Sequence, residues 1–186
     1  SDNGIGMSEE EIVKYIAQVA FSGATDFITK YTEESKGEGA GIIGHFGLGF
    51  YSAFMVSDKV VIDSKSYTDA PAVRWTSEDG MEYEIEPSDR TERGTAITLY
   101  IDEADKDFLN LWTLRSTLEK HCAFMPVPIF VSEVVKPEEP TEGEEPKKAP
   151  EPQQINDTHP LWMKRPNECT DEEYREFYRK VFNDYE

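Results

Sequence analysis

The spacing of apolar residues predicts helices near the N-terminus and strands in the middle of the chain. Ser8 and Glu11 match a capping box, and apolar residues at helical spacing follow them, so a helix of about three turns is expected. A short helix is expected at 25–31 and a third after Gly49. From Lys59 onward, alternating and β-branched residues are typical of strands. The four expected strands, joined as an antiparallel meander, are 59–66, 72–77, 81–86 and 95–101.

The second half of the chain returns to helical spacing at 108–124, where Pro126 ends the pattern, and a last strand is expected at 127–131. Thr170 and Glu173 form a second capping box. The helix that it opens carries apolar and aromatic side chains on one side, namely Tyr174, Phe177, Tyr178 and Val181. These elements predict an α+β fold, a two-layer sandwich with helices packed on one face of a mostly antiparallel sheet.

A proline- and glutamate-rich segment divides the chain. Residues 137–152 read PEEPTEGEEPKKAPEP and lack any large apolar residue, so they cannot bury enough surface to offset the entropy of ordering. We therefore predict a folded domain at 1–136 and an acidic linker at 137–154. Residues 155–186 are fewer than the roughly 40 that a domain needs, so we expect them to begin a second domain.

The composition narrows the possible partners. The chain has 38 acidic and 19 basic residues, a net charge of −19, which argues against binding to nucleic acid or an anionic membrane. No apolar run approaches the roughly 20 residues of a membrane span, and the N-terminus lacks the features of a secretory signal. Cys122 and Cys169 match neither a disulfide framework nor a zinc motif. We expect a cytoplasmic protein with free thiols and no metal ligands among these residues.

The first candidate motif is DxGxG at Asp2–Gly6, followed by Met7. Its two glycines allow a tight turn and the close approach of a flat ligand. The Asp2 carboxylate is able to accept a hydrogen bond from an exocyclic amine, and Met7 offers a polarizable surface for a ring. The alternative is a turn with an exposed aspartate.

The second candidate is GxxGxG at 44–49, which leads directly into an apolar segment. Backbone amides in such a loop form an anion cradle, although neither a P-loop nor a Rossmann fingerprint is present. The alternative is a glycine hinge that serves packing. A third feature, Gly94–Thr95, stands at the start of a strand, where the Thr95 hydroxyl is able to reach a ligand directly or through water; its alternative is an ordinary turn.

The order of these three features resembles the ATP-binding domains of the gyrase, histidine-kinase and MutL (GHKL) superfamily, with a Bergerat-type fold whose N-terminal part is missing. The segments between them are similar to the ninety-kilodalton heat-shock chaperones of the bacterial HtpG type, a heat shock protein 90 family. The similar segments are IAQVAFSGATDFI, IIGHFGLGFYSAFMVSDKV, ERGTAITLYI and LWMKRPNECTDEEYREFYRKVFNDYE. The resemblance implies an ATP-dependent, dimeric, cytosolic chaperone that uses ATP or ADP with Mg²⁺ and assists the folding of client proteins.

The resemblance also implies roles for single residues. Asp2 would hold the adenine amino group, Gly6 would line the base pocket and Met7 would pack on the base. Thr95 would join the adenine contact through water. The phosphates would lie against Gly47, Leu48, Gly49 and Phe50, of which Phe50 would also line the pocket. Residues 22–41 would form a lid over the nucleotide.

The chain departs from the family pattern in ways that affect catalysis. Tyr15 and Phe21 stand where many relatives have polar residues. The family's catalytic glutamate and magnesium-binding asparagine would lie upstream of Ser1, and the arginine that senses the γ-phosphate would lie downstream of residue 186. His45 is a substitute base only in principle, because a lone histidine between glycines is usually a solvent-exposed loop residue. We expect these 186 residues alone to bind nucleotide weakly and not to turn over ATP.

Two other functions are considered. The chain is a non-catalytic structural or self-association module if the face left by the missing helix seeks another copy. A strictly monomeric sedimentation profile at high concentration would count against that alternative. A histidine-kinase ATP domain is disfavoured, because such kinases have no counterpart to the segment LWMKRPNECTDEEYREFY.

Overall fold

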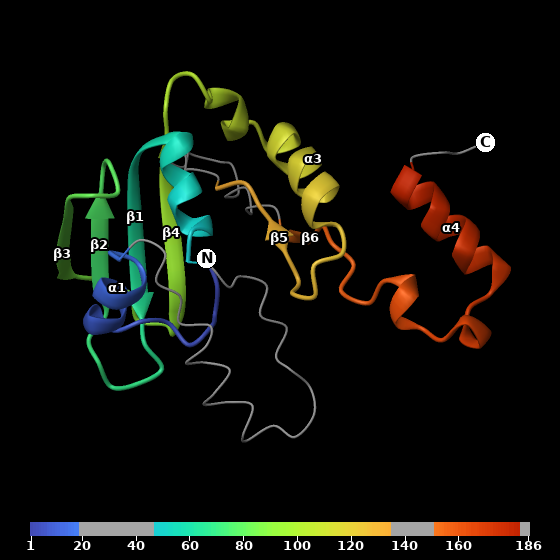
Figure 1. The fold of residues 1–186 in the computed structure, drawn as a ribbon, viewed down its shortest axis with the longest axis horizontal. Coiled ribbons are helices and arrows are strands. Elements are labelled where there is room, and N and C mark those ends of the chain that lie inside the picture. Colours follow the sequence, from blue (N-terminus) through green and yellow to red (C-terminus); the bar gives the residue numbers. More distant parts are fainter. Residues whose placement is uncertain (19–46, 135–150, 183–186) are drawn as a thin grey trace, which may run out of the picture. The chain divides into compact units, whose positions relative to one another are not determined.

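The computed structural model describes residues 1–18, 47–134 and 151–182 (Figure 1). The chain forms two compact units, Ser1–Phe108 and Leu109–Glu186. The expected helix at 25–31, the lid at 22–41, Phe21 and His45 lie outside the described residues. The predicted domain at 1–136 therefore spans the first unit and part of the second.

The first unit is built on a four-stranded antiparallel sheet. Its strands are β1 (Ser57–Lys65), β2 (Val73–Ser77), β3 (Tyr83–Pro87) and β4 (Gly94–Ile101), in the order β3-β2-β1-β4. The expected meander is wrong for the last strand, because β4 pairs with β1 and not with β3. The cause is burial: β1 is largely buried and needs a partner on both edges, whereas β3 is short, exposed and carries Glu84 and Glu86, as edge strands do.

One face of this sheet holds the core of the first unit. Val60, Ile62, Val73 and Trp75 pack there against Ile12 of α1 (Glu9–Tyr15), and Trp75 is only 1% exposed. The 3₁₀ helix η1 (Gly49–Met55) covers the same face and packs two phenylalanine rings edge-on against the Trp75 ring (Figure 1). The expected packing of helices on one face of an antiparallel sheet is confirmed. The helix expected after Gly49 is present, as a 3₁₀ helix.

The capping box at the start of α1 is confirmed. The Ser8 backbone N–H donates to the Glu11 carboxylate at 2.8 Å, and the Glu11 backbone N–H donates to Ser8 Oγ at 3.3 Å. The helix is shorter than expected and ends at Tyr15. At the C-cap of the helix, the Tyr51 hydroxyl donates to the Ile16 carbonyl at 2.6 Å. Burial raises the pKa of that Tyr51 hydroxyl.

The second unit contains α3 (Leu111–Cys122) and a short antiparallel pair, β5 (Phe130–Val131) and β6 (Gln153–Gln154). A 3₁₀ turn, η2 (Lys106–Leu109), precedes it. Asn110 caps α3 by accepting the backbone N–H groups of its first residues. Gln153 and Gln154 were expected at the end of the linker, but they pair with β5. That 155–186 begins a further domain stays a prediction.

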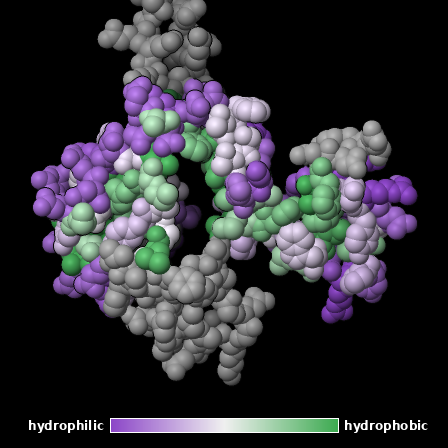
Figure 2. Space-filling model, turned by 45° about the horizontal axis from the view of Figure 1, so that its top comes forward, coloured by the Kyte–Doolittle hydropathy of each residue, from purple (hydrophilic) through white to green (hydrophobic). Residues whose placement is uncertain are grey.

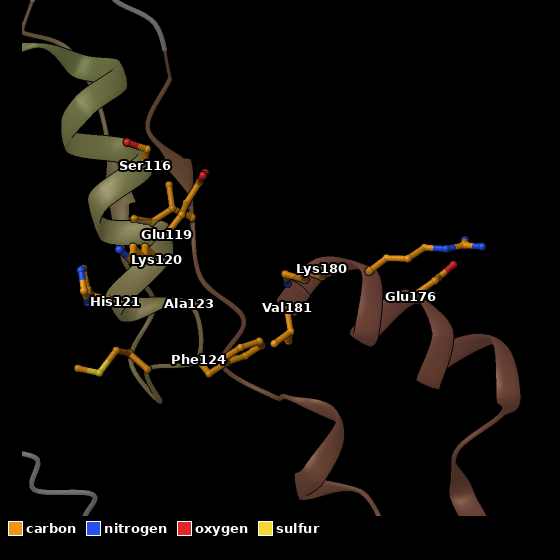
Figure 3. A pocket seen from close by; sticks show the side chains of 12 residues that line it. Ser116, Glu119, Lys120, His121, Ala123, Phe124, Glu176, Lys180 and Val181 are labelled. Atoms are coloured by element: carbon orange, nitrogen blue, oxygen red, sulfur yellow. The ribbon is translucent and has the colours of Figure 1, made fainter. Parts of the chain in front are cut away.

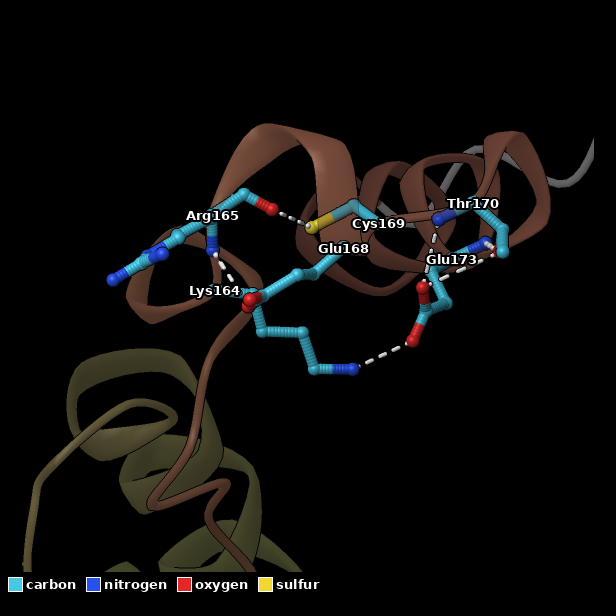
Figure 4. Close-up of polar contacts among 6 residues, drawn as sticks. All are labelled: Lys164, Arg165, Glu168, Cys169, Thr170 and Glu173. Atoms are coloured by element: carbon cyan, nitrogen blue, oxygen red, sulfur yellow. Dashed lines mark hydrogen bonds and ion pairs between the residues drawn. The ribbon is translucent and has the colours of Figure 1, made fainter.

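The C-terminal segment begins with the 3₁₀ turns η3 (Leu161–Met163) and η4 (Pro166–Glu168), and α4 (Asp171–Phe182) follows. The second capping box is confirmed: Thr170 and Glu173 bond reciprocally, and the Lys164 ammonium pairs with the Glu173 carboxylate at 2.6 Å (Figure 4). Apolar and polar side chains lie on different sides of α4 (Figure 2). This confirms the predicted amphipathic pattern.

Candidate functional site

The N-terminal segment lies beside the start of β4. The Asp2 backbone N–H donates to the Thr95 carbonyl at 2.8 Å, and the Thr95 N–H donates to Asp2 Oδ1 at 3.2 Å. The Gly4 N–H donates to the same Oδ1 at 2.8 Å. Within the described part of the chain no hydrogen bond reaches Oδ2 of the exposed Asp2 side chain. One carboxylate oxygen therefore orders the loop, and the other is available to a donor from a ligand.

Two glycines make this approach of the backbones possible. Gly6 has a φ of +63°, and a Cβ atom there would lie 1.9 Å from the Lys65 carbonyl oxygen. Gly94 has a φ of +116°, and a Cβ atom there would lie 2.2 Å from the Asp2 carbonyl oxygen. Both positions need glycine because the conformation and the close approach exclude a side chain. The first and third motifs are thus brought together.

The side chain of Ser64, on β1, hydrogen-bonds to both motifs, and this residue was not predicted from the sequence. Its side chain is fully buried, and its Oγ accepts the Met7 backbone N–H at 2.8 Å. The same Oγ lies 2.9 Å from Thr95 Oγ1 and 3.4 Å from the Gly94 carbonyl oxygen. A serine at an inward position of an otherwise apolar strand pattern was the available signal, because a buried hydroxyl needs partners.

Two arginines hold the outer side of the same loop. Arg90 Nη2 donates to the Asp2 carbonyl at 3.2 Å, and Arg93 Nη2 donates to the Asn3 carbonyl at 3.2 Å. These guanidinium groups bind backbone oxygens and leave the Asp2 carboxylate unpaired by them. They were also missed, because the sequence does not show which carbonyl an arginine reaches.

The second motif joins the site through its aromatic residue. Phe50 and Met7 pack against the same core cluster, and the Phe50 ring lies 5.7 Å from the Trp75 ring. Gly47 has a φ of +64°, Leu48 is half exposed, and a Cβ atom on Gly49 would meet open space. Within the described residues no hydrogen bond joins Gly47–Gly49 to the Asp2 segment or to Thr95. The structure thus brings together Asp2, Gly6, Met7 and Thr95, and it links Phe50 to them by packing.

An ion-pair network lies on the opposite face of the sheet. Asp63 accepts hydrogen bonds from Arg74, at 2.8 and 3.1 Å, and from the Ser88 hydroxyl at 2.6 Å. Burial opposes the ionisation of Asp63, but these hydrogen bonds and the charges of Arg74 and Arg90 outweigh it, so the pKa of Asp63 is lowered. The Asp63 carboxylate in turn raises the pKa of Arg74.

This network predicts a pH-dependent contribution to stability. A carboxyl group with a lowered pKa in the folded state stabilises the fold above its unfolded pKa of about 3.9, and this contribution is lost as the pH falls through the folded pKa. Asp63→Asn is therefore expected to lower the melting temperature at pH 7 and to have a smaller effect at pH 3. Thermal unfolding at both pH values measures this, with Asp58→Asn on the same strand as a control. An equal effect of Asp63→Asn at both pH values would contradict the prediction.

A separate hollow of about 1110 Å³ lies in the second unit, between α3 and α4 (Figure 3). Its lining combines apolar Phe124 and Val181 with charges of both signs, such as Glu119 and Lys180, and it includes none of the residues of the three motifs.

Over the ranges that the structure describes, no group of three or more potential metal ligands occurs, and no helix has the length and apolarity to cross a membrane.

Known proteins are similar to the whole length of this chain. A family model described as Hsp90 protein matches residues 132–186. The chaperone protein HtpG of Bacteroides fragilis is 50% identical over 98% of the chain, and that of Porphyromonas gingivalis is 47% identical over the same share. The HtpG protein of Vibrio vulnificus is 38% identical over 100% of the chain. The chain spans 26% to 29% of the length of these relatives.

Fold and sequence similarity agree. The first unit is an α+β sandwich in which an antiparallel sheet carries its helices on one face, consistent with part of a GHKL-like ATP-binding fold. The chain is similar to proteins of the Hsp90 family. The relatives named above are chaperones of the HtpG type.

Proposed function

We propose that this chain supplies the adenine-binding part of an ATP-dependent molecular chaperone. The observation that carries the proposal is that the two oxygens of the Asp2 carboxylate differ: Oδ1 accepts two backbone N–H groups, and Oδ2 accepts none from the described residues. A carboxylate oxygen held in this way by the backbone is a preorganised acceptor for an exocyclic amine. The names of the relatives support the chaperone role.

The remaining ligand contacts follow from the same arrangement. Thr95 lies beside Asp2 and contributes a hydroxyl, Met7 contributes its thioether, and Gly6 allows the close backbone approach to Lys65 that holds this segment in place. The backbone of Gly47–Gly49 would meet the phosphates, and Gly49 has open space around it. Mg²⁺ would accompany the phosphates, and none of the residues named here is assigned to it. In the full-length protein, the resemblance further implies unfolded client proteins as partners and a homodimer.

Asp2→Asn tests the adenine contact. The asparagine carbonyl oxygen replaces Oδ1 as the acceptor for the Gly4 and Thr95 N–H groups, so its NH₂ group faces the amine of the ligand, donor against donor. ADP affinity is expected to fall at least about tenfold, because a charge-assisted hydrogen bond is lost. Calorimetric titration of the full-length gene product measures this change.

Asp79→Asn is the matched control. Asp79 is an exposed aspartate that likewise accepts two backbone N–H groups, those of Met81 and Glu82, in a turn between β2 and β3. Its replacement is expected to leave ADP affinity unchanged. The proposal is wrong if Asp2→Asn binds ADP as tightly as the parent protein, or if both variants lose affinity equally.

A further inference from the structure

The hydrogen bonds of Ser64 constrain the direction in which its hydroxyl donates. A serine hydroxyl has one hydrogen to donate and two lone pairs to accept with. The Met7 backbone N–H occupies one lone pair, because an amide nitrogen only donates. The single hydrogen of Ser64 then goes either to Thr95 Oγ1 at 2.9 Å or to the Gly94 carbonyl oxygen at 3.4 Å. The 2.9 Å contact forms whichever hydroxyl donates, but if Thr95 donates, the Ser64 hydrogen is left with the Gly94 carbonyl at 3.4 Å, beyond the usual range of an O–H···O bond. Donation from Ser64 to Thr95 is therefore favoured.

We propose that Ser64 is a positioning residue that turns the Thr95 hydroxyl into a hydrogen-bond donor toward the ligand and thereby selects adenine. This inference rests on the proposed function. When Ser64 donates to Thr95 Oγ1, the hydrogen of Thr95 is free to point to another acceptor. In the opposite arrangement Thr95 donates its hydrogen to Ser64, so it is able only to accept a hydrogen bond from a ligand. Ser64 is fully buried, so water does not compete for its hydrogen.

The resulting pattern matches one edge of one base. Asp2 Oδ2 accepts and the Thr95 hydroxyl donates, and the backbone bond of Thr95 to Asp2 keeps the two residues together. Adenine presents the complementary pair, an amine that donates and the neighbouring ring nitrogen N1 that accepts. Guanine presents a carbonyl and an N–H at these places, so both of its groups would meet a like group and lose their hydrogen bonds.

The test uses the full-length gene product and two ligands that differ at one atom. ADP and 1-deaza-ADP share the amine, sugar and phosphates, but 1-deaza-ADP has a C–H group in place of N1. The parent protein is expected to bind ADP about tenfold more tightly than 1-deaza-ADP, as one hydrogen bond implies. In Ser64→Ala the ratio of the two affinities is expected to fall close to one, because the Thr95 side chain loses the hydrogen bond that fixes the position of its hydroxyl.

Ser77→Ala is the matched control. Ser77 is a buried serine on β2, and its hydroxyl is also satisfied, by the Glu82 carbonyl at 2.6 Å and the Gly80 N–H at 2.9 Å. Its replacement is expected to keep the tenfold ratio even if it lowers stability as much as Ser64→Ala does. Ser64→Cys, whose thiol is a weak donor of similar shape, is expected to lose most of the ratio without a cavity. Ser64→Thr, which keeps the hydroxyl, is expected to restore it.

The outcomes separate this inference from the proposed function. If the parent protein binds neither nucleotide, the proposed function is wrong and the inference with it. If the parent binds ADP but does not distinguish it from 1-deaza-ADP, adenine binding stands and the donor role of Thr95 is wrong. If the parent distinguishes them and both Ser64→Ala and Ser64→Cys keep the ratio, Ser64 does not orient Thr95.

Discussion

Gly6→Ala is expected to lower the stability of the first unit by about 3 kcal/mol, because alanine is strained at a positive φ and its Cβ atom has no room. The Cβ atom would lie 1.9 Å from the Lys65 carbonyl oxygen and 2.5 Å from the Lys65 carbonyl carbon, both backbone atoms at the end of β1. The neighbouring Tyr67 N–H donates to the Ile5 carbonyl at 2.7 Å, so the two segments cannot separate without losing this bond. Urea unfolding and the hydrogen exchange of the Tyr67 and Met7 amides measure the effect.

Gly49→Ala is the control for this prediction. Gly49 lies at the start of η1, its φ is not positive, and a Cβ atom there would have no neighbour within 4 Å. Alanine at this position is expected to leave stability unchanged or to raise it slightly, because it restricts the unfolded chain more than glycine does. Equal effects of the two substitutions would show that the close approach at Gly6 is not a structural requirement.

The role of Gly6 shows how far a motif carries. From the sequence, the glycines of DxGxG were interpreted as allowing a tight turn and the close approach of a flat ligand. The structure shows that Gly6 and Gly94 are first needed for the approach of one protein segment to another. A glycine in a motif indicates that there is no space for a side chain, but it does not indicate whether a ligand or another protein segment fills that space. Only the structure shows which of the two it is.

Local features were predicted well because their causes are local. Both capping boxes depend on residues three apart, and both are present as predicted. The strands of the first unit follow from alternating residues within each segment. The order of the strands in the sheet does not follow from these local patterns, because the patterns of β3 and β4 are both compatible with an edge position. Burial of β1 on both edges decides it.

Ser64 illustrates the same limit for the site. Its partner Thr95 is 31 residues away, and the two meet because Ser64 and Thr95 are paired across β1 and β4. A shift of the register by one residue would turn Ser64 to the other face of the sheet. A serine at an inward strand position signals a hydroxyl that needs partners, but only the strand register identifies these partners.

Gln153 and Gln154, at the end of the predicted linker, show a related limit. Gln153 and Gln154 are polar and follow a proline-rich run, so composition assigns them to the linker. They form a strand because β5 supplies a partner from an earlier part of the chain. Val131 is thereby paired with Gln153, which comes much later in the chain. Asn156, two residues after β6, bonds to the backbone of the segment that leads into β5.

Asn156→Ala is accordingly expected to destabilise the second unit by about 3 kcal/mol, because three backbone groups lose their partner. The Asn156 side chain accepts the Ile129 N–H at 2.7 Å and donates to the carbonyls of Met125 and Val127 at 2.9 and 2.8 Å. It is 8% exposed, so water replaces these bonds poorly. Hydrogen exchange measured by mass spectrometry over 125–131 reports the loss directly.

Asn110→Ala is the control, because it removes an asparagine whose hydrogen bonds to the backbone are exposed and not buried. Asn110 accepts two backbone N–H groups at the start of α3, but its bonds are exposed, and loss of such a cap costs about 1 kcal/mol. Protection over 125–131 is expected to survive Asn110→Ala and to fall sharply in Asn156→Ala. If Asn156→Ala retains this protection, the backbone hydrogen bonds between β5 and β6 are sufficient to hold the pair, and the Asn156 side chain contributes little to stability.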